Sequence, residues 1–428
     1  MQPSVRKKSW MNRFIDTIEY WGNKLPHPFI LFGMLVVITL IGSWILSQAG
    51  CSITYMAASR TPGEPEKEVT IAVTNLLSGE NLRYLITKYP DIFIGYPPMK
   101  LVLVMMAATA FIEKTGFFGT FMKKYLLRAP RSLVTFAVVF VGVNSNLMSD
   151  AGTLFALTMG GIIFAALGRN PLIGVILGWA SSSGGFTANL FLAGTDALLA
   201  GITEGVVKEM GVAVDINPAM NYFFMASATF FLSVTLTLFT EKVVCRMVGD
   251  GDGKVNMALL EEHKLTADQE KGLRWAFYGF LFFLAVMAAL TVPSWAILRN
   301  AKGGFLPKSP FFAGIITLIA FFFVSTGLPY GVATGEIKKW KDIPRLVSAG
   351  LREAIPLLTT TMMAAVFIDM MNKSNIFKMV AVAGAEALRG ANIGLLPLCL
   401  MIIVVTTIIN PFMTSGSSKW LIIAPMIV

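Results

Sequence analysis

Two groups of polar residues that could bind a small cation or a solute interrupt long apolar stretches of this sequence. The first lies between the apolar segments 133–143 and 154–167 and contains Asn144, Asn146 and Asp150. Amide and carboxylate oxygens are hard ligands, which small cations such as sodium prefer. The two apolar arms are each too short to cross a membrane comfortably. Together they predict a hairpin that enters and leaves a bilayer from one side.

The second group lies at residues 181–189, where the apolar stretch 172–201 is interrupted. Backbone carbonyls at Ser183 and Gly184 and the side chain of Asn189 offer further oxygen ligands for a cation. The pattern predicts a broken helix. Secondary transporters use hairpins and broken helices to place backbone groups and helix ends around a solute near the middle of the membrane.

Asp196 is an acid within the second half of that predicted broken helix. An acid in the middle of a span costs roughly 2.5–3.5 kcal/mol on insertion scales, so Asp196 requires water or a positively charged partner. A sodium ion or a proton would supply that partner. The alternative interpretation is that Asp196 caps a helix near the outer membrane interface.

The composition excludes an ordinary soluble protein. Hydrophobic residues make up 55% of the chain and charged residues 14%, whereas soluble domains carry about a quarter charged residues. The surplus of 35 Lys and Arg over 25 Asp and Glu gathers in particular loops, which indicates membrane orientation rather than nucleic-acid binding. Three scattered cysteines and two histidines indicate neither a disulfide framework nor a His/Cys metal site. We therefore predict an all-α polytopic membrane protein.

The distribution of basic residues predicts the orientation of the spans. Arg6, Lys7, Lys8 and Arg13 precede the first apolar segment, which places the N-terminus in the cytoplasm by the positive-inside rule. Every strongly basic loop then falls on the cytoplasmic side if 133–167 is a hairpin rather than two spans. The other predicted apolar segments are 29–46, 92–112, 172–201, 219–239, 276–298, 311–330, 354–371 and 393–409.

A second polar turn, at residues 410–420, is similar to the first: Asn, then Met, then hydroxyl residues and Gly. The predicted topology reaches the first turn from the cytoplasm and the second from outside. Two similar turns that are reached from opposite sides of the membrane predict an inverted repeat whose two hairpin tips meet at one site. Residues 421–428 alone follow the second turn, fewer than the ~20 residues of a span. The sequence therefore predicts a truncated second repeat.

These features divide the chain into four segments. They are an N-terminal part with two spans (1–131), a first repeat core (132–240), a cytoplasmic linker (241–274) and an incomplete second repeat (275–428). Within the linker, residues 249–253 (GDGDG) have part of the composition of a calcium loop. They lack the remaining ligands and the closing Glu, so we predict a flexible turn there.

Four short motifs lie along the chain: residues 12–14 (NRF), 22–28 (GNKLPHP), 185–190 (GFTANL) and 415–420 (SGSSKW). In this combination the sequence resembles the AbgT family of p-aminobenzoyl-glutamate transporters, which includes efflux pumps implicated in sulfonamide resistance. The resemblance extends through nearly the whole chain. It implies an inverted-repeat, ion-transporter-like fold with two re-entrant hairpins and broken helices.

The resemblance also implies a site and an assembly. Asp196, Asn410, Ser417 and Trp420 match the family's solute-site residues, while further Arg, Asp and Pro site residues of the family belong to a segment beyond residue 428. Family members form dimers of nine-span protomers. The resemblance thus implies a homodimer in the lipid bilayer of the bacterial inner membrane, with a small-molecule solute and no nucleic-acid partner.

We therefore expect ion-coupled secondary transport of p-aminobenzoyl-glutamate or a related aromatic amide or antimetabolite anion. The sequence leaves open whether the solute is taken up or is exported together with sulfonamides. It also leaves open whether the coupling ion is sodium or a proton; no other cofactor is expected. A dicarboxylate carrier of the same architecture and a truncated product without transport activity are alternatives. An intramembrane protease that uses Asp150 and Asp196 is a rival from another class. Neither acid stands in a recognisable catalytic motif, so we expect no enzyme and no catalytic residues.

Overall fold

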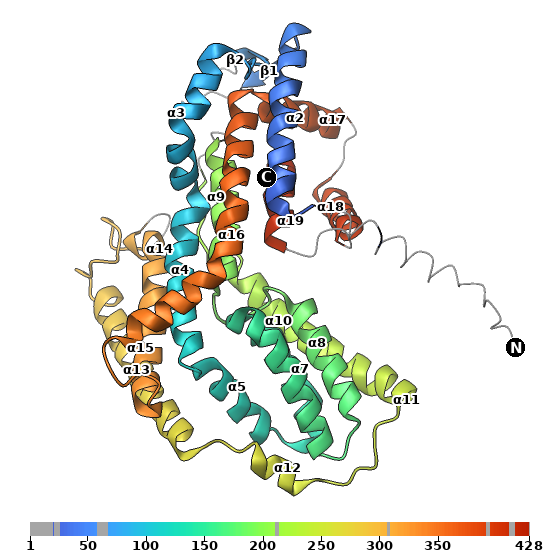
Figure 1. The fold of residues 1–428 in the computed structure, drawn as a ribbon, viewed down its shortest axis with the longest axis vertical. Helices are drawn as coiled ribbons and strands as arrows, with labels where there is room; N and C mark the ends of the chain where they lie inside the picture. Colours follow the sequence, from blue (N-terminus) through green and yellow to red (C-terminus); the bar gives the residue numbers. More distant parts are fainter. Residues whose placement is uncertain are drawn as a thin grey trace, which may run out of the picture. The chain divides into compact units, whose positions relative to one another are not determined.

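The computed structural model contains helices and one small β-hairpin in the part of the chain that it describes (Figure 1). Strand β1 (Ser52–Ala57) pairs antiparallel with β2 (Lys67–Ala72). Six of the described helices are long and apolar enough to cross a membrane, which confirms a polytopic, mainly helical membrane protein. The described residues are 20, 26–57, 67–209, 214–305, 309–390, 394–410 and 416–427.

The described helices follow one another along the chain. They are α2 (Pro28–Gln48), α3 (Gly79–Gly95), α4 (Pro97–Lys114), α5 (Phe117–Arg128), α6 (Val134–Asn144), α7 (Ser149–Ala166), α8 (Pro171–Gly185), α9 (Gly194–Glu209), α10 (Tyr222–Phe239), α11 (Cys245–Val248), α12 (Met257–Glu262), α13 (Ala267–Thr291), α14 (Pro310–Ala313), α15 (Ile315–Thr334), α16 (Asp342–Lys373), α17 (Ile376–Gly390), α18 (Leu395–Ile409) and α19 (Gly416–Ile427). Short 3₁₀ turns are η1 (Arg131–Leu133) and η2 (Ser145–Met148), and a π-helical turn, η3 (Thr240–Val244), joins α10 to α11.

The chain forms two compact units. We call the unit made of Lys100–Gly201 and Ile216–Ile355 the central unit. The terminal unit is made of Met1–Met99, Ile202–Asp215 and Pro356–Val428. Helices α4, α9 and α16 each begin in one unit and end in the other.

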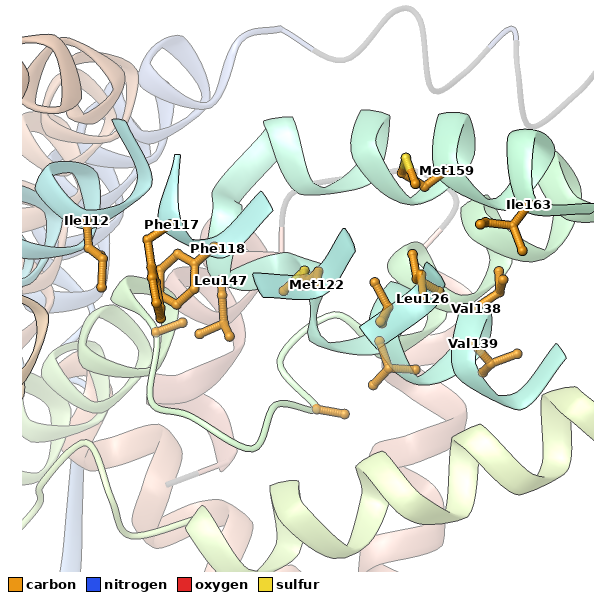
Figure 2. Close-up of a cluster of buried hydrophobic side chains, with 14 of the residues drawn as sticks. Ile112, Phe117, Phe118, Met122, Leu126, Val138, Val139, Leu147, Met159 and Ile163 are labelled. Carbon is orange, nitrogen blue, oxygen red and sulfur yellow. The ribbon is translucent and has the colours of Figure 1, made fainter. Parts of the chain in front are cut away.

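The core of the central unit is a cluster of buried apolar side chains (Figure 2). Phe118 and Leu126 of α5 lie in one cluster with Val139 of α6, Leu147 of η2 and Met159 of α7. Inside a bilayer such packing stabilises through van der Waals contact, since lipid tails are as apolar as the side chains. The cluster therefore fixes the two hairpin arms and the turn between them against α5.

Helices α7 and α8 approach so closely that their backbones touch at glycine positions. A Cβ atom on Gly174 would overlap the carbonyl group of Gly160, and one on Gly178 would overlap that of Ala156. Small residues at facing positions let membrane helices pack backbone against backbone. Helix α8 is therefore held along the second arm of the hairpin, and the two run side by side in Figure 1.

The terminal unit packs α2, α3 and α16 around Leu76, Val366 and Met370. Asp369 of α16 accepts a hydrogen bond from the Tyr84 hydroxyl at 3.3 Å. This contact lies within the terminal unit and ties α3 to α16.

Several element bounds differ from those predicted. The loop after the first span contains the β-hairpin and the first turns of α3, because Ser78 caps a helix by accepting from the Asn81 amide. Helix α13 begins at Ala267 rather than 276, because Thr266 and Gln269 form a capping box. Helix α17 was not predicted.

The break in the broken helix also lies later than predicted. Helix α8 continues to Gly185, and α9 begins at Gly194. Ser181 is accommodated inside α8, where its hydroxyl donates to the Leu177 carbonyl, 2.7 Å away in the preceding turn. The break thus covers 186–193 instead of 181–189.

We expect Gly174→Val to destabilise the protein, because the valine Cβ would overlap the Gly160 backbone and push α8 away from α7. Overpacking of this kind costs about 1–3 kcal/mol or more. The apparent melting temperature of the purified protein in detergent measures the loss. Gly42→Val is the matched control, since a Cβ at Gly42 meets no atom within 4 Å. Equal melting temperatures for the two variants would contradict the backbone contact.

Candidate functional site

The tip of the hairpin contacts the break between α8 and α9. Asn144, the last residue of α6, accepts a hydrogen bond from the Leu190 amide at 2.9 Å and donates one to the Phe140 carbonyl at 2.8 Å. The Leu190 carbonyl in turn accepts from the Tyr222 hydroxyl at 3.2 Å. Both backbone groups of Leu190 are therefore satisfied by side chains from neighbouring helices, where no helix supplies partners.

Ser182, near the end of α8, joins several hydroxyl and amide groups of the hairpin. Its hydroxyl accepts from the Ser145 hydroxyl at 3.0 Å and shares a hydrogen bond with the Thr153 hydroxyl at 2.8 Å. Its carbonyl accepts from the Asn146 amide at 3.4 Å. The structure thus brings Asn144 and Asn146 of the first predicted ion-binding group against the helix that carries the second group.

The second predicted ion-binding group lies at the end of α8 and in the break. The carbonyls of Ser183 and Gly184 accept no hydrogen bond from the described residues, as expected for the last turn of a helix. The Asn189 side chain is 0% exposed, and neither its amide nitrogen nor its oxygen has a partner among the described residues. A buried unpaired amide is costly, so these groups are available to a ligand. Asp150 lies in α7, but its side chain lies outside the described residues.

Asp196 lies in the first turn of α9 and is 6% exposed. Its Oδ2 accepts a hydrogen bond from the Ala193 amide at 2.7 Å, so it does cap the start of its own helix. It also lines a cavity of about 420 Å³ beside the break. The helix-capping interpretation and the ligand-binding interpretation therefore apply to the same side chain.

The cavity is mainly apolar, with a few polar groups, as small-molecule sites usually are. Its walls come from the break, from α9 and from α10 with the loop before it. Phe186 lies at its edge with φ 39° and ψ −91°, a backbone conformation that glycine adopts far more readily. Such strain costs about 1–3 kcal/mol and gathers at functional sites. All lining residues belong to the central unit.

The remaining predicted site residues lie in the terminal unit. Trp420 donates a hydrogen bond from its indole nitrogen to the Thr203 hydroxyl of α9 at 3.0 Å. Lys419 donates to the side-chain oxygen of Asn410, and Ser417 is half-buried in α19. Residues 411–415 of the second predicted tip lie outside the described residues. The meeting of two tips and the inverted repeat therefore stay predictions.

Sequence reasoning missed a clamp on Arg169, in the loop between α7 and α8. Its guanidinium donates to both oxygens of Glu241 at 2.8 and 3.1 Å, to Asp250 Oδ1 at 2.8 Å and to Thr135 Oγ1 at 2.7 Å. Burial opposes the charge, but the hydrogen bonds with Glu241 and Asp250 raise the pKa of Arg169 above its ordinary value. The clamp thus ties the start of the hairpin to the chain that follows α10.

The same region contains Glu241, Cys245 and Asp250, whose ligand atoms lie within 4.8 Å of one another. Arg169 already donates to all three, so a cation has no place among them. The predicted flexible turn at 249–253 is docked on the α7–α8 loop, since the Gly253 amide donates to the Gly168 carbonyl at 2.9 Å. The sequence feature that indicates this cluster of contacts is Arg169, a charged residue just before the start of α8.

The sequence matches the model of the AbgT transporter family over residues 13–428. The chain belongs to the AbgT family. Among curated proteins it is 31% identical over 425 residues to the p-aminobenzoyl-glutamate transport protein of Escherichia coli (strain K12), covering 99% of this chain and 81% of that protein. Membership confirms the resemblance drawn from the motifs.

Two solved structures of transporters are similar to this AbgT chain. MtrF of Neisseria gonorrhoeae, described within a class of antimetabolite efflux pumps, has a TM-score of 0.89 and 31% identity over 97% of this chain and 82% of that chain. The YdaH transporter of Alcanivorax borkumensis has a TM-score of 0.83 and 27% identity over 94% and 82%. This AbgT protein is accordingly a multi-pass membrane transporter and not an enzyme. The hypothesis of an intramembrane protease is therefore wrong.

We expect Asn144→Ala to destabilise the protein by about 1–3 kcal/mol, because it leaves the Leu190 amide without an acceptor. The apparent melting temperature in detergent measures this loss. Asn217→Ala is the matched control, since Asn217 accepts only within its own turn, from the Ala219 amide. A smaller loss for Asn144→Ala than for the control would show that the tip does not support the break.

Arg169→Ala removes every hydrogen bond of the clamp. Because Glu241 and Asp250 are 42% and 46% exposed, we expect a moderate loss of about 1–2 kcal/mol. Limited proteolysis of the linker should also speed up, as residues 249–253 lose their anchor. Lys264→Ala breaks a surface ion pair with Glu261, whose two side chains are 65% and 63% exposed, and serves as the control, with little expected change. Equal proteolysis of the two variants would contradict the clamp.

Proposed function

We propose that this AbgT protein is an ion-coupled secondary transporter of p-aminobenzoyl-glutamate or a related aromatic amide or antimetabolite anion. The observation that carries the proposal is the cavity beside the α8–α9 break, which combines a buried acid with apolar walls. The E. coli relative is a p-aminobenzoyl-glutamate transport protein, and MtrF represents antimetabolite efflux pumps. Uptake and efflux are both consistent with these relatives.

The coupling ion binds, in this proposal, where α8 ends. Carbonyls at Ser183 and Gly184 point from a helix C-terminus, which carries partial negative charge. The buried and unpaired Asn189 side chain adds an oxygen ligand in the same break. Oxygen ligands from the end of α8 and from the break support a small hard cation such as sodium. A proton that binds to Asp196 is the alternative coupling ion.

The proposal also includes the membrane in which the protein lies, the orientation of its N-terminus and its oligomeric state. Basic residues before α2 and in the linker support a cytoplasmic N-terminus in the bacterial inner membrane. The family resemblance supports a homodimer. The family resemblance also supports a solute-binding role for Trp420, whose indole nitrogen donates to the Thr203 hydroxyl within the terminal unit.

A dicarboxylate carrier fits the cavity less well. Succinate and citrate have no aromatic ring or amine, so they would present only anionic groups and hydroxyls to a cavity whose one ionisable lining residue among those described is an acid. Competition by succinate or citrate distinguishes the two solutes.

We expect proteoliposomes that contain this chain to accumulate labelled p-aminobenzoyl-glutamate when a sodium or proton gradient is imposed. The two gradients are imposed separately and in both directions, so that the driving ion and the direction of transport are read from the same experiment. Liposomes without protein give the background. Uptake that equals this background under every gradient would contradict the proposal, and displacement by succinate alone would favour the dicarboxylate carrier.

In the same assay, we expect Asp196→Asn to abolish gradient-driven flux while the protein still expresses and folds, because the buried charge is lost at constant shape. Glu204→Gln is the control on the same helix. Glu204 pairs with Lys208 and does not line the cavity. Undiminished ion dependence in Asp196→Asn would remove Asp196 from the mechanism.

A further inference from the structure

The cavity beside the break contains an acid and no cation. Asp196 is the one ionisable group among the described residues that line it. The carboxylate receives one hydrogen bond, from the Ala193 amide, so it has further capacity to accept. A buried carboxylate attracts N–H and O–H donors and repels anions. The cavity therefore selects against the carboxylate end of a solute.

Three aromatic rings form the apolar wall of the cavity: Phe186, Phe224 and Phe231. All three line the cavity, and none of them contacts another aromatic ring in the described part of the chain. Elsewhere in the central unit rings do pair, as in the stacked Phe191 and Phe322. Ring faces without an aromatic partner bind the ring of a ligand by stacking or edge contact.

The backbone strain at Phe186 points to the same role. A phenylalanine at φ 39° persists only where its surroundings hold it, and here the Ala188 amide closes the turn on the Gly185 carbonyl at 2.6 Å. The strained turn places the Phe186 ring at the cavity edge rather than in the buried core. Met220 and Met225 complete the wall with flexible side chains that adapt to a ligand's shape.

We propose that this cavity is the subsite for the aromatic amine end of the solute. The amino group donates an N–H hydrogen bond to the Asp196 carboxylate, and the ring packs against Phe186 and Phe224. The inference rests on the proposed function, which supplies a solute with an aminobenzoyl group. Because an amine conjugated to a benzoyl ring is uncharged at neutral pH and keeps its N–H donors, it donates a hydrogen bond to the carboxylate and adds no charge of its own. The glutamate carboxylates are held outside this cavity.

The subsite explains how one cavity accepts different solutes. Solutes that share an aminophenyl group and differ beyond it present the same donor and the same ring to Asp196 and the phenylalanines. Specificity then depends on the amine, because a site built to accept a hydrogen bond rejects an analogue that lacks the donor.

The test is displacement of labelled p-aminobenzoyl-glutamate from the purified chain by unlabelled analogues. The probes are p-aminobenzoyl-glutamate, benzoyl-glutamate and p-dimethylaminobenzoyl-glutamate. The second lacks the amine and is smaller, and the third lacks N–H donors and is larger, so size does not explain a shared loss. We expect both to bind roughly tenfold to a hundredfold more weakly than the amine, as for the loss of a hydrogen bond to a charged group.

Three variants test which residues produce the preference for the amine. In Asp196→Ala the preference for the amine over benzoyl-glutamate should vanish, while in Glu204→Ala, on the same helix but not in the cavity lining, it should remain. Phe186→Gly removes a ring and suits the backbone, so it should weaken the amine and benzoyl-glutamate alike and leave their ratio unchanged. The comparison of analogues on the unmodified chain stands even if Asp196→Ala fails to fold.

The outcomes separate this inference from the proposed function. Binding and transport of p-aminobenzoyl-glutamate with equal affinity for benzoyl-glutamate would overturn the amine subsite and leave the transport function intact. A preference for the amine that persists in Asp196→Ala would also overturn it. Absence of binding by any probe, together with absence of uptake, would overturn both.

Discussion

A break in a membrane helix leaves backbone N–H and C=O groups without partners in a medium that offers no water, and the site of this protein depends on how those groups are satisfied. At Leu190 the amide donates to Asn144 at the hairpin tip and the carbonyl accepts from Tyr222 of α10. The hairpin is therefore a structural requirement of the break. Where the hairpin leaves groups unsatisfied, as at Asn189 and at the end of α8, ligand capacity remains.

The hairpin can serve the break only if it lies close to α8, and the glycines of α7 and α8 allow that approach. Without side chains at Gly160 and Gly174 the two backbones touch, which brings Ser182 within hydrogen-bond distance of Ser145 and Thr153. At the other end of the hairpin, Arg169 binds the chain after α10 through charge-assisted hydrogen bonds. The arms are thus fixed at both ends, and α10 is held where it forms the cavity wall.

The cavity follows from these constraints. Because α8 stops at Gly185 and α9 restarts at Gly194, the space that a continuous helix would fill stays open beside α10. The strained turn at Phe186 and the first-turn acid Asp196 then face that space. An acid with apolar aromatic surroundings differs from the cationic sites that anions usually require, so this cavity favours a hydrogen-bond donor over an anionic group.

The amino-acid sequence alone predicts the membrane class, the hairpin arms, the existence of a break, the acid after it and the family. These depend on local composition and on short motifs, and a run of apolar residues has the same meaning whatever its neighbours are. Tertiary structure decided where the break lies and what supports it, since Ser181 and Ser182 resemble loop residues until their hydroxyl partners in α8 and the hairpin are known. It also decided the Arg169 clamp, whose partner Asp250 lies 81 residues away in the chain. No local pattern encodes a contact across that separation, because the side chains meet only after the helices between them have packed.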